Sequence, residues 1–202
     1  MSIIVYSPGR TGSTLISQAM ANKFKLPVYS TELNRNYLAP SDSIIHTHNP
    51  LFFTKENREN NTAVISYRRN LFDTVISKLI SNYTLEYTSY TNKEVSISIT
   101  ETEFCNMYYF CKCFYKLIDL SKFDVVIYVE FEELIANPLY LFSKFGEASE
   151  MNYNTQKSSY THSVISNIDY CKTLFSQLEQ NIDITDIIAI VKSNLEEDFP
   201  LI

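Results

Sequence analysis

Tryptophan is absent from this chain of 202 residues, and glycine occurs only three times. Two of the three glycines, Gly9 and Gly12, lie close together, so the sequence concentrates its backbone freedom in one short segment. No apolar run approaches the roughly 18 residues that a membrane-spanning helix needs, and the first residues lack the basic and apolar regions of a secretion signal. We therefore expect a soluble, cytoplasmic protein that does not bind a membrane.

Basic residues are also scarce. The chain has 17 Lys and Arg against 23 Asp and Glu, a net charge of −6, which argues against nucleic acid or an acidic membrane surface as the partner. Any anion site must then be a local pocket of positive charge. The sequence contains no repeats and no internal linker, so its length predicts a single domain, residues 1–202.

The four cysteines do not follow a metal-binding pattern. Cys105, Cys111 and Cys113 fall in a stretch of helical periodicity, where about 100° per residue turns them in three different directions. Together with Cys171, they are expected to be reduced, structural thiols, and we expect no bound metal.

Short apolar runs alternate with amphipathic stretches along the chain. Runs typical of buried parallel strands lie at residues 3–6, 43–47, 62–67 and 124–129, with a shorter strand expected at 28–30. Helical spacing of apolar residues is found at 15–24, 71–80, 104–118, 139–145, 168–178 and 184–195. This alternation predicts an α/β fold with a parallel sheet, on whose flank the last two helices should pack.

The segment Pro8-Gly9-Arg10-Thr11-Gly12-Ser13-Thr14 connects the first predicted strand to the first predicted helix. Its glycines let the backbone approach a ligand, Arg10 supplies a cation, and the helix start supplies free N–H groups, a combination that binds phosphate-like anions. The spacing differs from the triphosphatase pattern G-x-x-x-x-G-K-[ST] and from the dinucleotide pattern G-x-G-x-x-G. An ordinary strand-to-helix turn is the alternative.

Two histidines stand where the predicted strand 43–47 ends, in His46-Thr47-His48-Asn49-Pro50. Residues two apart in a strand face the same side, and ligands of parallel sheets collect at strand ends. Both rings are therefore candidates for one pocket, the alternative being a pair of packed or solvated histidines.

A second basic segment, Arg68-Arg69-Asn70, lies between the strand 62–67 and the helix that begins at residue 71. Asn70 is the expected N-cap of that helix, with Asp73 three residues later. Cations are poorly placed at a helix start unless an anion is bound there, so this segment also favours a ligand over plain surface.

In chain order, these segments resemble the sulfotransferases that use 3′-phosphoadenosine 5′-phosphosulfate (PAPS). Residues 8–14 are similar to the family's 5′-phosphosulfate loop, P-x-[KR]-[ST]-G-[ST]-[ST], and residues 69–77 to its 3′-phosphate motif, R-[ND]-P-x-D-x-x-x-S. Residues 46–50 resemble its K-T-H-x-P segment, and residues 131–138 its Y-E-D-[LM]-x-x-x-P segment. The resemblance covers the framework from residue 3 to about residue 138.

The resemblance implies a three-layer α/β/α fold with a central parallel sheet, related to the P-loop kinases. It also implies in-line transfer of a sulfuryl group from PAPS to a hydroxyl or amine, leaving adenosine 3′,5′-bisphosphate, without a metal. It implies catalytic roles for Arg10, His46 and His48, with His48 as the general base. The positions it implies for nucleotide binding are Arg10, Thr11, Gly12, Ser13, Thr14, Arg69, Ser77, Phe131 and, in place of a C-terminal R-K-G motif, Lys157.

Some positions depart from the family pattern. His46 replaces a lysine, Leu15 stands where the cytosolic branch has an adenine-stacking tryptophan, and Phe131 lacks a tyrosine hydroxyl. The expected acceptor is a small molecule or a carbohydrate. The sequence identifies neither the particular acceptor nor the oligomeric state. Two other interpretations are a P-loop-type small-molecule kinase, disfavoured by the missing Walker lysine, and a non-catalytic module that binds adenosine bisphosphate.

Overall fold

The computed structural model describes residues 2–30, 42–52, 61–84, 96–150, 164–181 and 184–198. At its centre is one five-stranded sheet. Its strands are β1 (Ser2–Tyr6), β2 (Val28–Ser30), β3 (Ile44–Thr47), β4 (Asn61–Tyr67) and β5 (Val125–Glu130). Every pairing is parallel, and the strand order is β2-β3-β1-β4-β5. The predicted α/β class with a central parallel sheet is thus confirmed.

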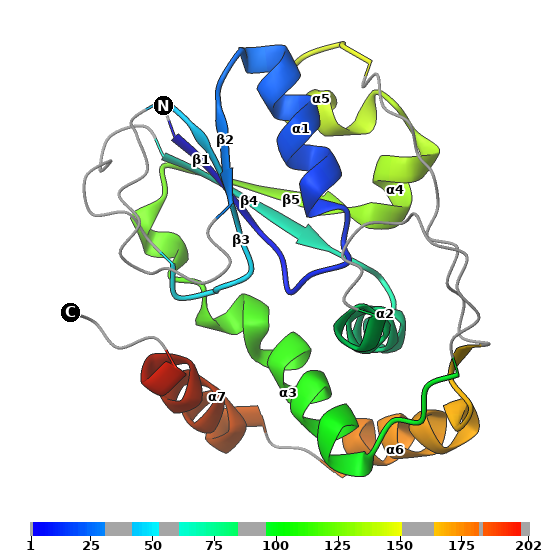
Figure 1. Cartoon of the computed structure of the whole chain (residues 1–202). Coiled ribbons are helices and arrows are strands. Elements are labelled where there is room, and N and C mark those ends of the chain that lie inside the picture. The colour runs from blue at the N-terminus through cyan, green and yellow to red at the C-terminus, as the bar shows by residue number, and fades with distance from the viewer. Residues whose placement is uncertain are drawn as a thin grey trace.

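Helices cover both faces of this sheet, consistent with the predicted three layers (Figure 1). One face carries α1 (Ser13–Phe24), α4 (Phe131–Ala136) and α5 (Tyr140–Ser143). The other carries α3 (Glu101–Leu117), with α2 (Leu71–Thr84) packed beside it. None of the helices described here has the length and apolarity to cross a bilayer.

The last two helices, α6 (Ile168–Asn181) and α7 (Ile184–Asp198), both pack against α3. The sequence predicted that these two helices pack on the flank of the sheet, but their main partner is the helix α3. Helix α4 was not predicted at all, because its six residues are too few to display a helical period.

The surroundings of β1 explain why the sequence of this strand is apolar without interruption. Successive side chains of a strand point to opposite faces. Ile3 and Val5 pack with Ile16 of α1, whereas Ile4 packs with Phe114 of α3 on the other face. Both faces of β1 are covered, and all five of its residues are buried.

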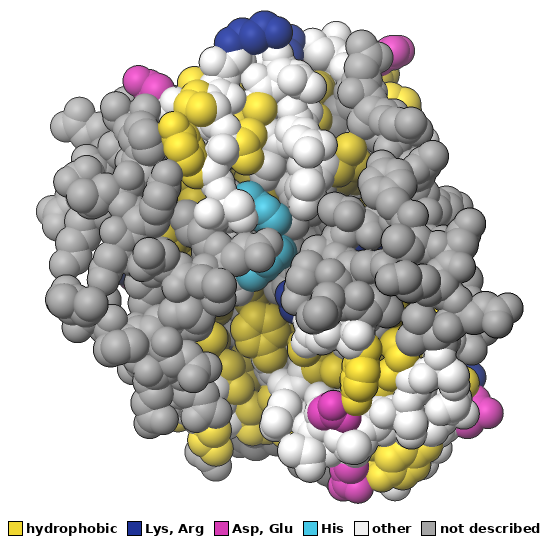
Figure 2. All heavy atoms as spheres, viewed as in Figure 1, with side chains coloured by type: hydrophobic (Ala, Val, Ile, Leu, Met, Phe, Trp, Pro, Cys, Tyr) yellow, Lys and Arg dark blue, Asp and Glu magenta, His cyan; other side chains and the backbone are white. Residues whose placement is uncertain are grey.

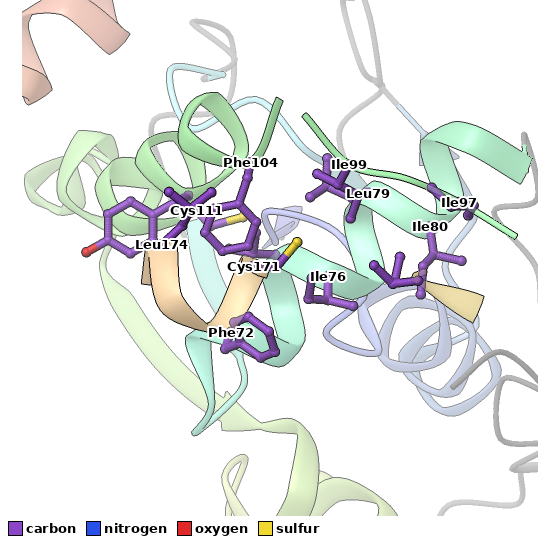
Figure 3. Packing of buried hydrophobic residues seen from close by; sticks show 13 residues of the cluster. Phe72, Ile76, Leu79, Ile80, Ile97, Ile99, Phe104, Cys111, Cys171 and Leu174 are labelled. Carbon is purple, nitrogen blue, oxygen red and sulfur yellow. The ribbon is translucent and has the colours of Figure 1, made fainter. Parts of the chain in front are cut away.

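A third apolar cluster joins α2, α3 and α6 (Figure 3). Its members include Phe72, Ile76 and Leu79 from α2, Phe104 and Cys111 from α3, and Cys171 and Leu174 from α6. The cluster holds α2 in a defined position beside the sheet. All four cysteines are free thiols, and burial raises the pKa of Cys111 to about 12, so this thiol stays protonated at neutral pH.

The strand order creates a topological switch at the carboxyl end of β1. The chain leaves β1 to build β2 and β3 on one side, and β4 and β5 are then added on the other side. Ligands of open parallel sheets bind in the crevice outside the carboxyl ends of the strands at such a point. Residues 8–14 and 68–70 follow β1 and β4, and residues 46–50 span the end of β3, so the fold brings the three candidate segments to this one edge.

Candidate anion-binding site

The loop between β1 and α1 has an unusual backbone. Gly9 (φ 100°), Arg10 (φ 60°) and Gly12 (φ 78°) all lie in the left-handed region. For a residue with a β-carbon this region costs of order 1 kcal/mol, and such strain is concentrated at functional sites. The conformation of Arg10 is therefore a first sign that this loop does more than connect two elements.

Hydrogen bonds hold the loop from within and from the neighbouring strand. The Ser7 hydroxyl accepts from the backbone N–H of Gly9 at 2.9 Å and lies 2.7 Å from the Thr11 hydroxyl. From β4, the Ser66 hydroxyl donates to the carbonyl of Thr11. These bonds fix the loop before any ligand arrives, which is the preorganisation that an anion site requires.

Each glycine of the loop lies against a side chain from elsewhere in the fold. A β-carbon at Gly12 would lie 2.7 Å from Cδ2 of Phe131, the first residue of α4. A β-carbon at Gly9 would lie 3.0 Å from both Cδ and Nζ of Lys78, in α2. The loop is thus contacted by α4 on one side and by α2 on the other.

Helix α1 begins directly after the loop with its N-terminal N–H groups facing that edge. Gly12 is the N-cap, none of the side chains that the structure describes caps the helix, and its first turn holds no acidic residue. Thr11 and Ser13 are buried, whereas Thr14 is exposed. The partial positive charge of a helix start therefore adds to that of the loop.

The two predicted histidines do come together. Their rings meet edge to face with centroids 4.6 Å apart. Nε2 of His46 lies 2.7 Å from the Ser13 hydroxyl, and Nδ1 of His48 lies 2.8 Å from the carbonyl oxygen of Ser7. Because a carbonyl only accepts, His48 donates from Nδ1, and in the neutral ring Nε2 is then the basic nitrogen.

His46 differs from His48 in its electrostatic surroundings. Its side chain is 7% exposed, and burial, followed by the charges of His48 and Lys78, lowers the pKa of His46 to about 3. At neutral pH this ring is uncharged and accepts a proton poorly. It is therefore suited to orient Ser13. The described histidines, cyan in Figure 2, are visible near the middle of that face.

Three cationic side chains converge on the loop: Arg10, Arg68 and Lys78. The guanidinium of Arg68 lies 4.5 Å from the ring centroid of Phe131, which itself contacts Gly12. Burial, followed by the charge of Arg68, lowers the pKa of Arg10. Burial likewise lowers the pKa of Arg68. The charge of Arg68 thus opposes that of Arg10, and a bound anion would relieve this opposition. The carboxylates of Glu132 and Asp73 already raise the pKa of Arg68, against the effect of burial.

Arg69, the predicted 3′-phosphate ligand, is turned toward α4. Its Nε lies 2.5 Å from Glu130 and its Nη2 lies 2.6 Å from Glu133, while its side chain is 61% exposed. The hydrogen bond to Glu133, followed by the charge of Glu130, raises the pKa of Arg69. Ser77 is half-buried farther along α2. A phosphate at Arg69 would have to share the guanidinium with these carboxylates or displace them.

The sequence motifs gave no role to two cations of the site, Arg68 and Lys78. Arg68 was nevertheless part of the basic segment Arg68-Arg69-Asn70, whose place at a helix start favours a ligand. No sequence signal identifies Lys78, since its place depends on how α2 packs. Lys157, predicted to bind the nucleotide, lies outside the described residues.

A cavity of about 370 Å³ borders the site on the α3 side of the sheet. Its lining consists of Ile65, Tyr67, Arg68, Leu71, Cys111, Lys112, Tyr115 and Tyr128. Arg68 thus belongs both to the cavity and to the loop surroundings. A cavity of this size and apolar character fits a small organic molecule.

Comparison with known proteins does not assign the chain to a family. No protein-family model matches the sequence, and no curated protein matches it either. The resemblance to PAPS sulfotransferases therefore depends on the sequence motifs alone. Within the described ranges, no group of three or more His, Cys, Asp or Glu side chains is arranged to hold a metal ion.

Proposed function

We propose that this chain is a PAPS-dependent sulfotransferase with a P-loop-like fold. It would transfer a sulfuryl group to a hydroxyl or amine of a small-molecule or carbohydrate acceptor and release adenosine 3′,5′-bisphosphate. The observation that carries this proposal is the convergence of Arg10, Arg68 and Lys78 on a preorganised loop at the switch point of the sheet. Burial and the charge of Arg68 lower the pKa of Arg10, and the oxyanion of a bound phosphosulfate would offset both effects.

The chemistry follows from where charge develops. As the acceptor oxygen attacks sulfur, the bond from sulfur to the bridging oxygen breaks, and its electron pair stays on the departing 5′-phosphate. Arg10 and the N–H groups of residues 11–14 would stabilise that charge. Nε2 of His48 would take the proton of the acceptor, because its Nδ1 already donates to Ser7. His46, uncharged and joined to Ser13, would orient the start of α1.

The rest of the nucleotide would extend toward α4. Arg69 would bind the 3′-phosphate with help from Ser77. An exposed ion pair contributes only about 0–1 kcal/mol, so exchanging the Glu133 contact of Arg69 for a phosphate costs little. Phe131, which lies beside Gly12, would contact the nucleotide. Lys157, from the C-terminal part of the chain, would also bind the nucleotide.

Nucleotide binding is the first test. Thermal unfolding would be measured with adenosine 3′,5′-bisphosphate, with adenosine 5′-phosphate, and with ATP plus magnesium. A ligand at 100 times its Kd stabilises by about 2.7 kcal/mol, so the bisphosphate should raise the melting temperature clearly and more than the monophosphate does. Stabilisation by ATP and magnesium alone would contradict the proposal and favour a kinase.

Turnover is the second test. Labelled PAPS would be incubated with a panel of phenols, aliphatic alcohols, amines and sugars, with heat-inactivated protein as the control. Transfer of label to at least one acceptor class is the expected outcome. Tight binding of the bisphosphate without transfer to any acceptor would identify a non-catalytic module instead.

A further inference from the structure

Among the described residues, Lys78 is the basic group of the site that comes from the interior of a helix. It is the eighth residue of α2, yet its Cδ and Nζ both lie 3.0 Å from the place that a β-carbon on Gly9 would occupy. Helical side chains lean toward the N-terminus of their helix. The N-terminus of α2 follows β4 directly, so this lean brings the side chain toward the carboxyl edge of the sheet.

The stem of Lys78 and its ammonium group lie in different surroundings. Next to it in sequence, Leu79 is buried in the cluster of α2, α3 and α6, and Lys78 itself is half-buried. A lysine can pack its stem beside such a core while its ammonium reaches a polar site. At the other end lies the backbone of Gly9, whose missing β-carbon makes room for the amine.

The ammonium also shares the electrostatic surroundings of His46, whose pKa its charge helps to lower. His46 is uncharged at neutral pH and so supplies no positive charge to the site. Arg10 supplies a planar guanidinium with fixed donor directions, whereas a lysine supplies a compact point charge on a flexible stem. The loop segment 7–14 contains no lysine of its own.

We propose that Lys78 binds the sulfuryl group of PAPS. Its ammonium, the N–H groups at the start of α1 and His46 would form a subsite for the terminal tetrahedral oxyanion, at the position where that group is transferred. This inference rests on the proposed function, since it assigns a residue to the transferred group. The flexible stem lets the charge follow the sulfuryl oxygens as the bond to phosphate breaks.

Titration calorimetry without acceptor tests this assignment, because PAPS carries the sulfuryl group and adenosine 3′,5′-bisphosphate does not. Lys78→Met should weaken PAPS binding by about tenfold or more and bisphosphate binding by less than about threefold, as expected for the loss of one charge-assisted contact to the terminal group. Lys78→Arg should recover part of the affinity for PAPS. Lys116→Met, at an exposed position on α3, is the matched control and should change neither value.

The possible results separate the two proposals. If the wild type binds neither nucleotide, the proposed function fails and this inference fails with it. If the wild type binds both nucleotides and Lys78→Met weakens them equally or not at all, only the role of Lys78 is refuted. Should the Met variant unfold, Lys78→Gln, which keeps a polar end group, replaces it. The affinities for PAPS and for adenosine 3′,5′-bisphosphate are then compared in the same way, and the same outcomes support or refute the role of Lys78.

Discussion

Acidification should destabilise this protein through His46. The ring is 7% exposed, and its pKa is lowered from 6.5 to about 3, mainly by burial. Between these two values the unfolded chain binds a proton that the folded protein does not bind, so stability falls as pH falls through this window. Each unit of pH within it costs about 1.4 kcal/mol, which amounts to about 2–3 kcal/mol for this one residue between pH 7.5 and 4.5.

The measurement is urea unfolding of the wild type and of His46→Gln at pH 7.5, 5.5 and 4.5. The variant removes the titrating ring and leaves the other ionisable groups in place, so the difference between the two pH dependences isolates His46. The chain has only three histidines, and the ring protons of His46 can be assigned by comparing NMR spectra of the same two proteins. A midpoint for His46 between pH 6 and 7, or equal pH dependence of stability in both proteins, would refute the reasoning.

Four substitutions test the loop and its neighbours. Gly12→Ala combines a φ of 78° with a β-carbon 2.7 Å from Phe131, so it should lower the free energy of unfolding by about 1–3 kcal/mol, measured in urea; an unchanged value would mean that the loop relaxes freely. Arg10→Ala should slow sulfuryl transfer about 100-fold or more by removing transition-state charge stabilisation, and near-normal turnover would exclude Arg10 from the mechanism. Arg69→Ala should weaken binding of adenosine 3′,5′-bisphosphate much more than binding of adenosine 5′-phosphate; equal losses would contradict a 3′-phosphate site. His48→Asn should slow transfer by about 10²–10⁴-fold with nucleotide affinity retained, whereas a rate within a few-fold of wild type would assign the base elsewhere.

The strands and the longer helices follow from the sequence because their signal is local. The unbroken run of β1 reflects a strand covered on both faces, and the spacing from Leu71 to Ile80 gave the buried face of α2. The position of the site also follows from the sequence, because parallel strands place the segments after β1, β3 and β4 at one edge. Neither argument requires knowledge of which distant residues touch.

In contrast, only the tertiary structure decided which side chains belong to the site and which of them are charged. Lys78 meets Gly9 because α2 is held by its packing against α3 and α6, and Arg69 meets Glu133 because α4 follows the neighbouring strand β5. The low pKa of His46 arises from burial and from charges on other elements. These properties depend on contacts between residues far apart in the chain, and hydrophobic periodicity, which reports only the buried face of each element, carries no information about such contacts.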